Sequence, residues 1–246
     1  MIQFIEDGHI YKVDNVDSIT SVRRVVSMFF KPFDAEYWSL RKCGNDVVKA
    51  VQLREEWCAK GQCASQAGKY LHSMIEHYIN DGTQDAKQCI VGYEGEYVSV
   101  EETVDVSREW EFFKNFCNDV AFNAFRTEWC VFDAESKMAG TIDLVCACGD
   151  GTYEIYDWKR SNKVDPQEEN RWSNGINGLE DLSDTSYWHY CLQQNLYRYM
   201  LEKNYGLRIS RMNLVVLHPD YNNYRVVPVP RMEREVQIMI NALPNL

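Results

Sequence analysis

The sequence lacks any long apolar run. None of its 246 residues lies in a stretch of about 18 consecutive apolar residues, so no membrane-spanning helix and no membrane partner are expected. The first residues also lack a basic segment followed by an apolar one, and they lack an Arg-rich amphipathic pattern, so neither a signal peptide nor a transit peptide is expected. We therefore expect a protein that acts inside a cell and is not secreted, in a compartment that the sequence leaves open.

The sequence also lacks a cysteine pattern typical of disulfides or zinc. Its nine cysteines are odd in number and scattered along the chain, which argues against a disulfide framework and fits free thiols. Cys58 and Cys63 have no His partner at zinc spacing, and Cys146 and Cys148 are separated by one residue on an expected strand. Most cysteines are therefore expected to behave as small buried hydrophobic residues.

Positive charge is scarce, because the formal net charge at pH 7 is −11. Proteins bind nucleic acid largely through Lys and Arg at phosphates, so this balance argues against a broad nucleic-acid-binding surface. A local basic stripe and metal ions can still hold a nucleic acid, provided that the excess acid lies elsewhere. The acidic residues do cluster, in residues 94–111 and 168–184, which offers an acidic surface to protein partners.

Length and apolar content indicate one large domain, or a core domain with a small appendage. We assign residues 1–60 to an N-terminal hairpin and helical region packed on the core, and residues 61–246 to the core itself. In the first region we expect a hairpin around Asp7-Gly8, a helix capped by Ser21 and helices in two pieces over residues 34–60; a short loop at Gly61 then leads into the core. The remaining pattern predicts helices at residues 64–80, from Ser107, 187–204 and 231–242, and strands at residues 125–132, 140–145, 153–159, 212–217 and 224–229.

The stretch from Gly140 to Lys159 contains the main candidate functional residues. Two strands joined at Gly149-Asp150-Gly151 form an expected hairpin. Asp157 and Lys159 lie two residues apart and so share one face of their strand, and Asp143 lies on the neighbouring strand. Two carboxylates and one ammonium would then converge, which suits binding of a divalent cation and activation of a water molecule.

An acidic residue two positions before a lysine is a weak motif by itself. It occurs twice more, in Asp85-Ala86-Lys87 and Glu135-Ser136-Lys137, but both of these lie in polar, turn-like sequence. Asp157-Trp158-Lys159 differs because it ends a β-rich run and follows a strand that bears an Asp. The structural alternative is an ordinary ion pair at the end of a strand.

Four motifs together resemble the PD-(D/E)xK nuclease superfamily, and within it the RecB-type and the phage and mitochondrial exonuclease-like branch. Gly140-Thr141-Ile142-Asp143 precedes Asp157-Trp158-Lys159, although Ile142 stands where the family often has Pro. The segment from Gly68 to Glu76 resembles the Gly-x-x-x-His helix of that branch, and the segment from Gln193 to Tyr197 resembles its Gln-x-x-x-Tyr helix. The resemblance implies a restriction-endonuclease-like α/β fold, with a central mixed sheet flanked by helices.

The resemblance also implies roles for individual residues. Asp143 and Asp157 would bind Mg²⁺ or Mn²⁺, with the backbone carbonyl of Trp158 as a further ligand. His72 would complete the metal site, and Lys159 would position the attacking water. Residues expected to support the site or to bind nucleic acid are Glu76, Glu128, Gln193 and Tyr197. For His72 and Glu128, a purely structural or surface role is the alternative.

The resemblance favours a metal-dependent deoxyribonuclease, and specifically an exonuclease that acts on single strands or DNA ends in repair, recombination or replication. The polar loop of residues 160–186 leaves directly from Lys159 and is interpreted as a lid or strand guide. Some relatives carry an iron–sulfur cluster on three cysteines after the Gln-x-x-x-Tyr helix, but the last cysteine here is Cys191, so no cluster is expected. The alternatives are a catalytically silent nucleic-acid-binding or protein-binding module, and an acidic interaction domain with an accidental motif.

Overall fold

The computed structural model of the protein describes residues 2–5, 10–13 and 19–243. Internal contacts divide the chain into two units. The sheet unit comprises the described parts of residues 1–31, 119–216 and 225–246, and the α3 unit comprises residues 32–118 and 217–224.

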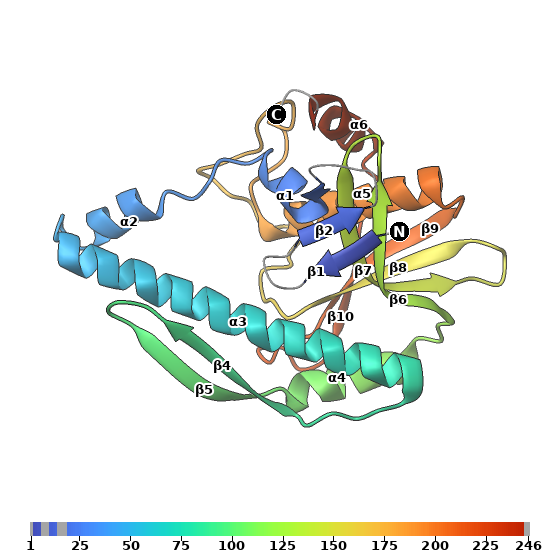
Figure 1. The fold of residues 1–246 in the computed structure, drawn as a ribbon, viewed down its shortest axis with the longest axis horizontal. Helices are drawn as coiled ribbons and strands as arrows, with labels where there is room; N and C mark the ends of the chain where they lie inside the picture. The colour runs from blue at the N-terminus through green and yellow to red at the C-terminus, as the bar shows by residue number, and fades with distance from the viewer. Residues whose placement is uncertain (1, 6–9, 14–18, 244–246) are drawn as a thin grey trace. The chain divides into compact units, whose positions relative to one another are not determined.

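The sheet unit is built on a mixed six-stranded sheet (Figure 1). Its strands run in the order β10-β9-β8-β7-β3, and β6 pairs with β7 as well. The pairs β8–β9 and β3–β7 are parallel, whereas β6–β7, β7–β8 and β9–β10 are antiparallel. The strands are β3 (Thr20–Ser21), β6 (Ala124–Asp133), β7 (Met138–Ala147), β8 (Tyr153–Lys159), β9 (Ile209–Val216) and β10 (Arg225–Pro228), and a separate antiparallel pair is β1 (Ile2–Ile5) with β2 (Ile10–Val13).

Helices α1 (Val22–Ser27), α5 (Ser186–Asn204) and α6 (Glu233–Ala242) belong to the same unit. Helix α1 begins at Ser21, whose side chain accepts a hydrogen bond from the backbone N–H of Arg24 at 3.2 Å, so the predicted N-cap is confirmed. Helix α5 contacts α1, α6 and the sheet, and its buried apolar residues pack into that core. These include Cys191, Leu192, Leu196, Met200 and Leu201.

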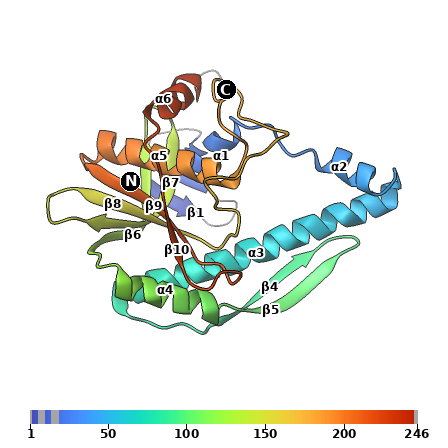
Figure 2. The same cartoon turned by 180° about the vertical axis from the view of Figure 1, so that it is seen from behind.

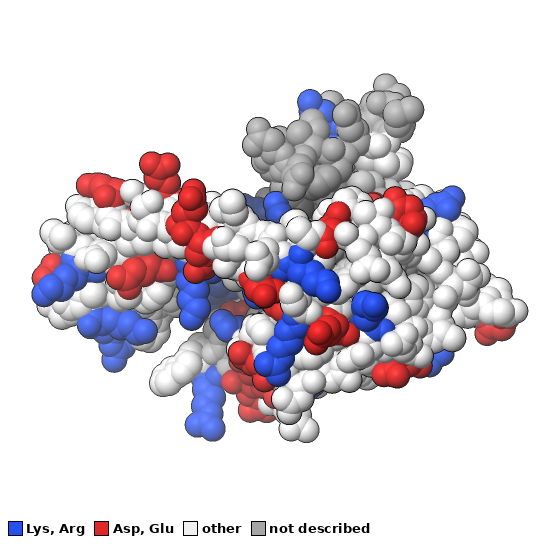
Figure 3. Space-filling view, turned by 90° about the horizontal axis from the view of Figure 1, so that it is seen from below, with Lys and Arg blue, Asp and Glu red and all other residues white. Residues whose placement is uncertain are grey.

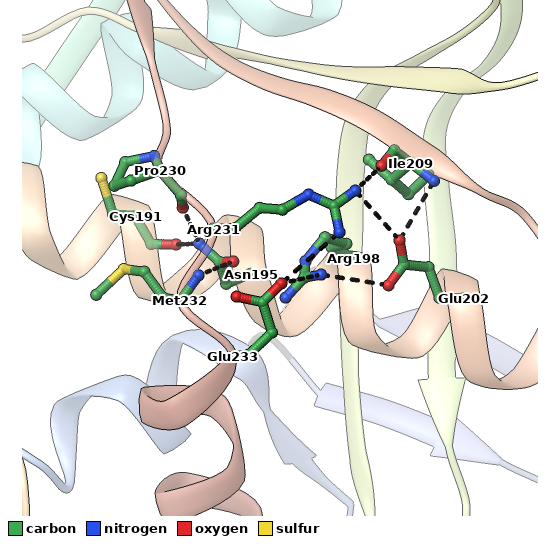
Figure 4. Close-up of polar contacts among 9 residues, drawn as sticks. All are labelled: Cys191, Asn195, Arg198, Glu202, Ile209, Pro230, Arg231, Met232 and Glu233. Carbon is green, nitrogen blue, oxygen red and sulfur yellow. Dashed lines mark hydrogen bonds and ion pairs between the residues drawn. The ribbon is translucent and has the colours of Figure 1, made fainter.

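Polar side chains of α5 fix the chain that leads into α6 (Figure 4). The amide of Asn195 donates hydrogen bonds to the carbonyls of Cys191 and Pro230, both at 2.9 Å, and accepts one from the N–H of Met232 at 2.9 Å. Arg198, one turn further along α5, bridges Glu202 and Glu233. Because Asn195 is fully buried and all these bonds are made inside the unit, the contact specifies where the C-terminal segment docks.

The α3 unit contains α2 (Ala35–Lys42), α3 (Val47–Asp81), the hairpin of β4 (Gln88–Glu94) and β5 (Ser99–Asp105), and α4 (Ser107–Asp119). Helix α3 is 35 residues long, begins at the N-cap Asp46 and ends at Gly82, which has a left-handed φ of 78°. It passes through Gly61 without a break, so the loop predicted at that residue is wrong. A single glycine inside a helix costs only about 1 kcal/mol, which the buried residues before and after it outweigh.

The β4–β5 hairpin packs along α3 in both ribbon views (Figures 1 and 2). Cys63 and Ala67 of α3 form an apolar cluster with Val91 of β4. The side chain of Gln66 both donates to the carbonyl of Gly92, at 3.0 Å, and accepts from its N–H, at 2.7 Å. The hairpin consists of two antiparallel strands of seven residues each.

The structure confirms the predicted α/β class. It also confirms the central mixed sheet with helices and the helical N-terminal region. Within the described part of the chain, no helix combines the length and apolar character needed to cross a membrane. The restriction-endonuclease-like identity of the core stays a prediction.

Candidate functional site

The β7–β8 hairpin places Asp143 and Asp157 side by side in the sheet unit. Its turn forms at Gly149-Asp150-Gly151, as predicted: the N–H of Cys148 donates to the carbonyl of Thr152 at 2.8 Å, and the N–H of Gly151 donates to the carbonyl of Cys148 at 3.1 Å. The strands pair from Ala147↔Tyr153 to Leu144↔Tyr156, and Asp143 and Asp157 are the next residues on each strand. The pairing ends at these residues, so their side chains stand where the two strands separate. One oxygen of Asp143 bridges the gap, because it accepts a hydrogen bond from the backbone N–H of Trp158 at 2.8 Å.

Asp157 and Lys159 lie on the same face of β8 and form an ion pair through Oδ2 and Nζ. Both side chains are largely shielded from solvent, with exposed fractions of 3% for Asp157 and 14% for Lys159. Burial works to lower the pKa of the Lys159 ammonium, while the charges of Asp157 and Asp143 work to raise it, and the net direction is upward. The Lys159 ammonium also lies 4.5 Å from the centre of the Tyr190 ring, a cation–π contact.

Helix α5 supplies a residue that the sequence reasoning missed. Gln194 is fully buried and donates a hydrogen bond from Nε2 to Oδ1 of Asp157 at 2.8 Å. It therefore fixes the orientation of that carboxylate. No signal in the sequence separates Gln194 from Gln193, because Asn195 and Arg198 are further polar residues on the buried side of the helix.

Gln193 and Tyr197 are neighbours one turn apart on α5, as their spacing predicted, and Gln193 donates a hydrogen bond to the Tyr197 hydroxyl at 3.0 Å. Burial, and then the electrostatic influence of Tyr11 and Asp157, raises the pKa of Tyr197. The Tyr197 ring packs directly on Gly140: a Cβ atom at Gly140 would lie 2.5 Å from Cε1 of Tyr197. The glycine that opens the Gly140-Thr141-Ile142-Asp143 motif is therefore required by the close approach of this ring.

Glu128 comes from β6 and faces Asp143. In the register that pairs Thr127 with Leu144 and Trp129 with Ile142, Glu128 lies opposite Asp143. Carboxylate oxygens of Glu128 and Asp143 approach within 4.8 Å of one another. The backbone of Glu128 has a φ of 39°, an uncommon value for a residue other than glycine, and such strain clusters at functional sites. Two carboxylates this close repel each other, and a cation between them would offset that repulsion.

The structure thus brings six of the sequence-predicted residues together in the sheet unit: Glu128, Asp143, Asp157, Lys159, Gln193 and Tyr197. The backbone of Trp158 joins them through its bond to Asp143, and its side chain is buried in the core. His72 and Glu76 lie one turn apart on α3, and both are half-buried within the α3 unit. Their predicted roles stay predictions.

The segment from Arg160 to Thr185 is packed rather than open. Val164 and Leu179 have no exposed surface. The backbone N–H of Ile176 donates to the carbonyl of Phe29 at 2.8 Å, and Gly175 forms a bridge with Phe30. A polar segment without periodicity is therefore held in place by a few buried apolar residues and by hydrogen bonds to the end of α1.

The two other matches to the acidic-x-Lys pattern lie outside this constellation. Asp85 accepts a hydrogen bond from His77 at 2.8 Å, within the α3 unit. Lys137 lies in the turn between β6 and β7, with a left-handed φ of 50°. On the face drawn in Figure 3, Lys and Arg side chains are interspersed with Asp and Glu, so that view offers no broad surface of one sign.

Comparisons with known proteins give little further information. No family model matches the chain, and no curated protein matches it. A solved structure described as "Crystal structure of SSO0001" aligns with 97% of this chain and 79% of its own, at 11% sequence identity and a TM-score of 0.38.

Proposed function

We propose that the chain is a metal-dependent nuclease of the PD-(D/E)xK superfamily, with a restriction-endonuclease-like core, that hydrolyses DNA phosphodiester bonds. The observation that carries the proposal is the meeting of Asp143, Asp157 and Lys159 where β7 and β8 separate. An ion pair that served only to end a strand would need neither the second aspartate nor the buried amide of Gln194 on Asp157.

The donor set fits a hard divalent cation. Asp143, Asp157 and Glu128 offer carboxylate oxygens, which Mg²⁺ and Mn²⁺ prefer. The proposed ligands are Asp143, Asp157, the backbone carbonyl of Trp158 and, from α3, His72. An imidazole ligand shifts the preference towards Mn²⁺. When bound, such a cation polarises a phosphoryl oxygen and lowers the pKa of a bound water.

The chain's own residues then have distinct tasks. Lys159, as an ammonium group, donates hydrogen bonds to the attacking water and to the phosphate oxygens on which negative charge develops. Gln194 holds Asp157 in one orientation, so that this carboxylate is arranged before substrate binds. Tyr197 and Gln193, linked to one another beside Gly140, hold the substrate strand or support Lys159. Glu128 supports the metal from the opposite strand.

We further propose that the enzyme is an exonuclease that acts on single strands or DNA ends, in repair, recombination or replication. The motif order is that of the exonuclease-like branch. In support, the segment Arg160–Thr185 leaves directly from Lys159 and is anchored on α1, so it forms a fixed wall beside the site.

Incubation of end-labelled linear DNA with the protein tests the nuclease proposal. We expect shortening of the DNA with Mg²⁺ and with Mn²⁺, faster with Mn²⁺, and none in the presence of EDTA. DNA that is bound but never cut, under any of these metals, would favour the silent binding module and contradict the proposal. Cleavage that persists in EDTA would contradict the metal dependence.

A further inference from the structure

Exposed aromatic rings and basic side chains gather on α2 and just before it, inside the α3 unit. Phe33, Tyr37 and Trp38 are exposed to 68%, 51% and 37% of their surface. Arg41 and Lys42, in the last turn of α2, are exposed as well. Rings of this size usually bury most of their area, so a set of exposed rings indicates an interaction site.

The rings and cations are ordered with respect to one another. The Arg41 guanidinium lies 5.5 Å from the centre of the Trp38 ring and donates a hydrogen bond to the Tyr37 hydroxyl at 3.2 Å. The Lys42 ammonium lies 5.4 Å from the centre of the Trp57 ring, on α3. Each cation therefore sits beside a π-face, and the two rings of Tyr37 and Trp38 meet edge to face at 5.2 Å.

The support beneath this surface is rigid. Asp34 caps α2 by accepting from the N–H of Tyr37 at 2.8 Å. Arg54 of α3 donates to the hydroxyl of Ser39, which is fully buried, at 3.1 Å, and so ties the two helices together. The rings are thus presented in fixed positions, which lowers the entropy lost when they bind a ligand.

The local charge also differs from that of the whole chain. Residues 31–60 hold six Lys and Arg against five Asp and Glu, although the net charge of the protein is −11. Three of these five acids are engaged with backbone amides: Asp34 and Asp46 cap α2 and α3, and Glu55 accepts from the N–H groups of residues 96, 97 and 98 at 3.1, 2.7 and 2.9 Å. The cations of α2 therefore face few competing carboxylates.

From this arrangement we infer that Phe33, Tyr37, Trp38, Arg41 and Lys42, here called the α2 platform, bind an unpaired nucleic-acid strand. Aromatic faces stack on bases whatever their sequence, and neighbouring cations contact the phosphates. A duplex hides its base faces, so the platform selects single strands. The inference rests on the proposed action on DNA, and it adds binding residues on α2 that have no role in the proposed hydrolysis.

Binding measured apart from hydrolysis tests the inference. Fluorescence anisotropy of a labelled oligo(dT) strand, in EDTA, compares the full-length protein with Tyr37→Ala/Trp38→Ala and with Arg41→Gln/Lys42→Gln. We expect the first pair to weaken single-strand binding about tenfold or more, with little effect on a duplex of the same length. We expect the second pair to make the plot of log affinity against log salt concentration less steep by about 1.4, because two phosphate contacts are lost.

Lys87→Gln/Lys114→Gln is the matched control, since it removes two exposed cations from the same unit away from the platform. The affinity of this control variant for oligo(dT) should stay within about twofold of the wild-type affinity. The inference is overturned if wild-type protein does not bind oligo(dT), if the platform variants bind like wild type, or if the control loses as much affinity as they do. It is also overturned if the aromatic pair instead abolishes self-association in sedimentation, because the rings then serve a second copy of the chain. Platform-dependent binding without any metal-dependent cleavage would leave the inference standing and refute the nuclease proposal.

Discussion

Gly140→Ala is expected to destabilise the sheet unit, chiefly through a clash with the Tyr197 ring. The added Cβ would lie 2.5 Å from Cε1 and 3.2 Å from the hydroxyl oxygen of Tyr197, and 3.2 Å from Cγ2 of Val22. Carbon atoms pack best at about 3.5–4.0 Å, so the Tyr197 ring has to move by about 1 Å or more. That ring is buried and hydrogen-bonded to Gln193, which leaves little room for relaxation.

Overpacking of this kind costs about 1–3 kcal/mol, and each kcal/mol lowers the melting temperature of a chain of this size by about 2–4 °C. Calorimetric melting of the variant measures the cost. Gly149→Ala is the matched control, because a Cβ there meets no atom within 4 Å and the residue needs no left-handed backbone. Gly149→Ala therefore measures only the small gain in stability that any Gly→Ala change brings by reducing the conformational entropy of the unfolded chain.

The partner of the clash is identified by a double-mutant cycle. In a Tyr197→Ala background the ring is absent, so Gly140→Ala should then cost less than about 0.5 kcal/mol. A Gly140→Ala variant that melts like wild type would refute the packing argument. So would a cost that persists unchanged when Tyr197 is absent.

Three further predictions concern the site. Asp143→Asn should weaken Mn²⁺ binding in titration calorimetry, because it removes a charged oxygen ligand, and unchanged affinity would make Asp143 structural. Gln194→Leu should cost about 1–3 kcal/mol in urea unfolding, because a buried carboxylate oxygen of Asp157 loses its amide donor; unchanged stability would show that this hydrogen bond contributes little. A covalently closed single-stranded circle should resist digestion under conditions in which a linear strand of the same sequence is degraded, and equal rates would make the protein an endonuclease.

The hairpin that carries the site was predictable from the sequence. Alternation along residues 140–145 and 153–159, with turn residues between them, predicted both strands and placed Asp143 beside Asp157. Spacing along a helix likewise predicted that Gln193 meets Tyr197. Both predictions rest on local periodicity, which the backbone geometry of strands and helices fixes directly.

Features set by tertiary contacts were harder to predict. Gly61 resembled a helix breaker, but α3 continues through it because Ala59 and Cys63 on either side are buried, and Cys63 packs against Val91 of β4. The segment Arg160–Thr185 has no periodicity, yet Val164 and Leu179 anchor it in the core. Gln194 differs from Gln193 only by one position on the helix, so its contact with Asp157 depends on how α5 is rotated against the sheet. No local pattern specifies that rotation.

Replacement of Lys159 tests the central claim most directly. The initial rate of hydrolysis of labelled linear single-stranded DNA with Mn²⁺ is compared for wild type, Lys159→Ala and Lys87→Ala, the last being the exposed lysine of Asp85-Ala86-Lys87. We predict that Lys159→Ala lowers the rate by about 10²–10³-fold, as expected for loss of a group that stabilises developing charge. DNA and Mn²⁺ affinities should stay close to wild type, and Lys87→Ala should cleave normally. Near-wild-type turnover by Lys159→Ala would contradict the account.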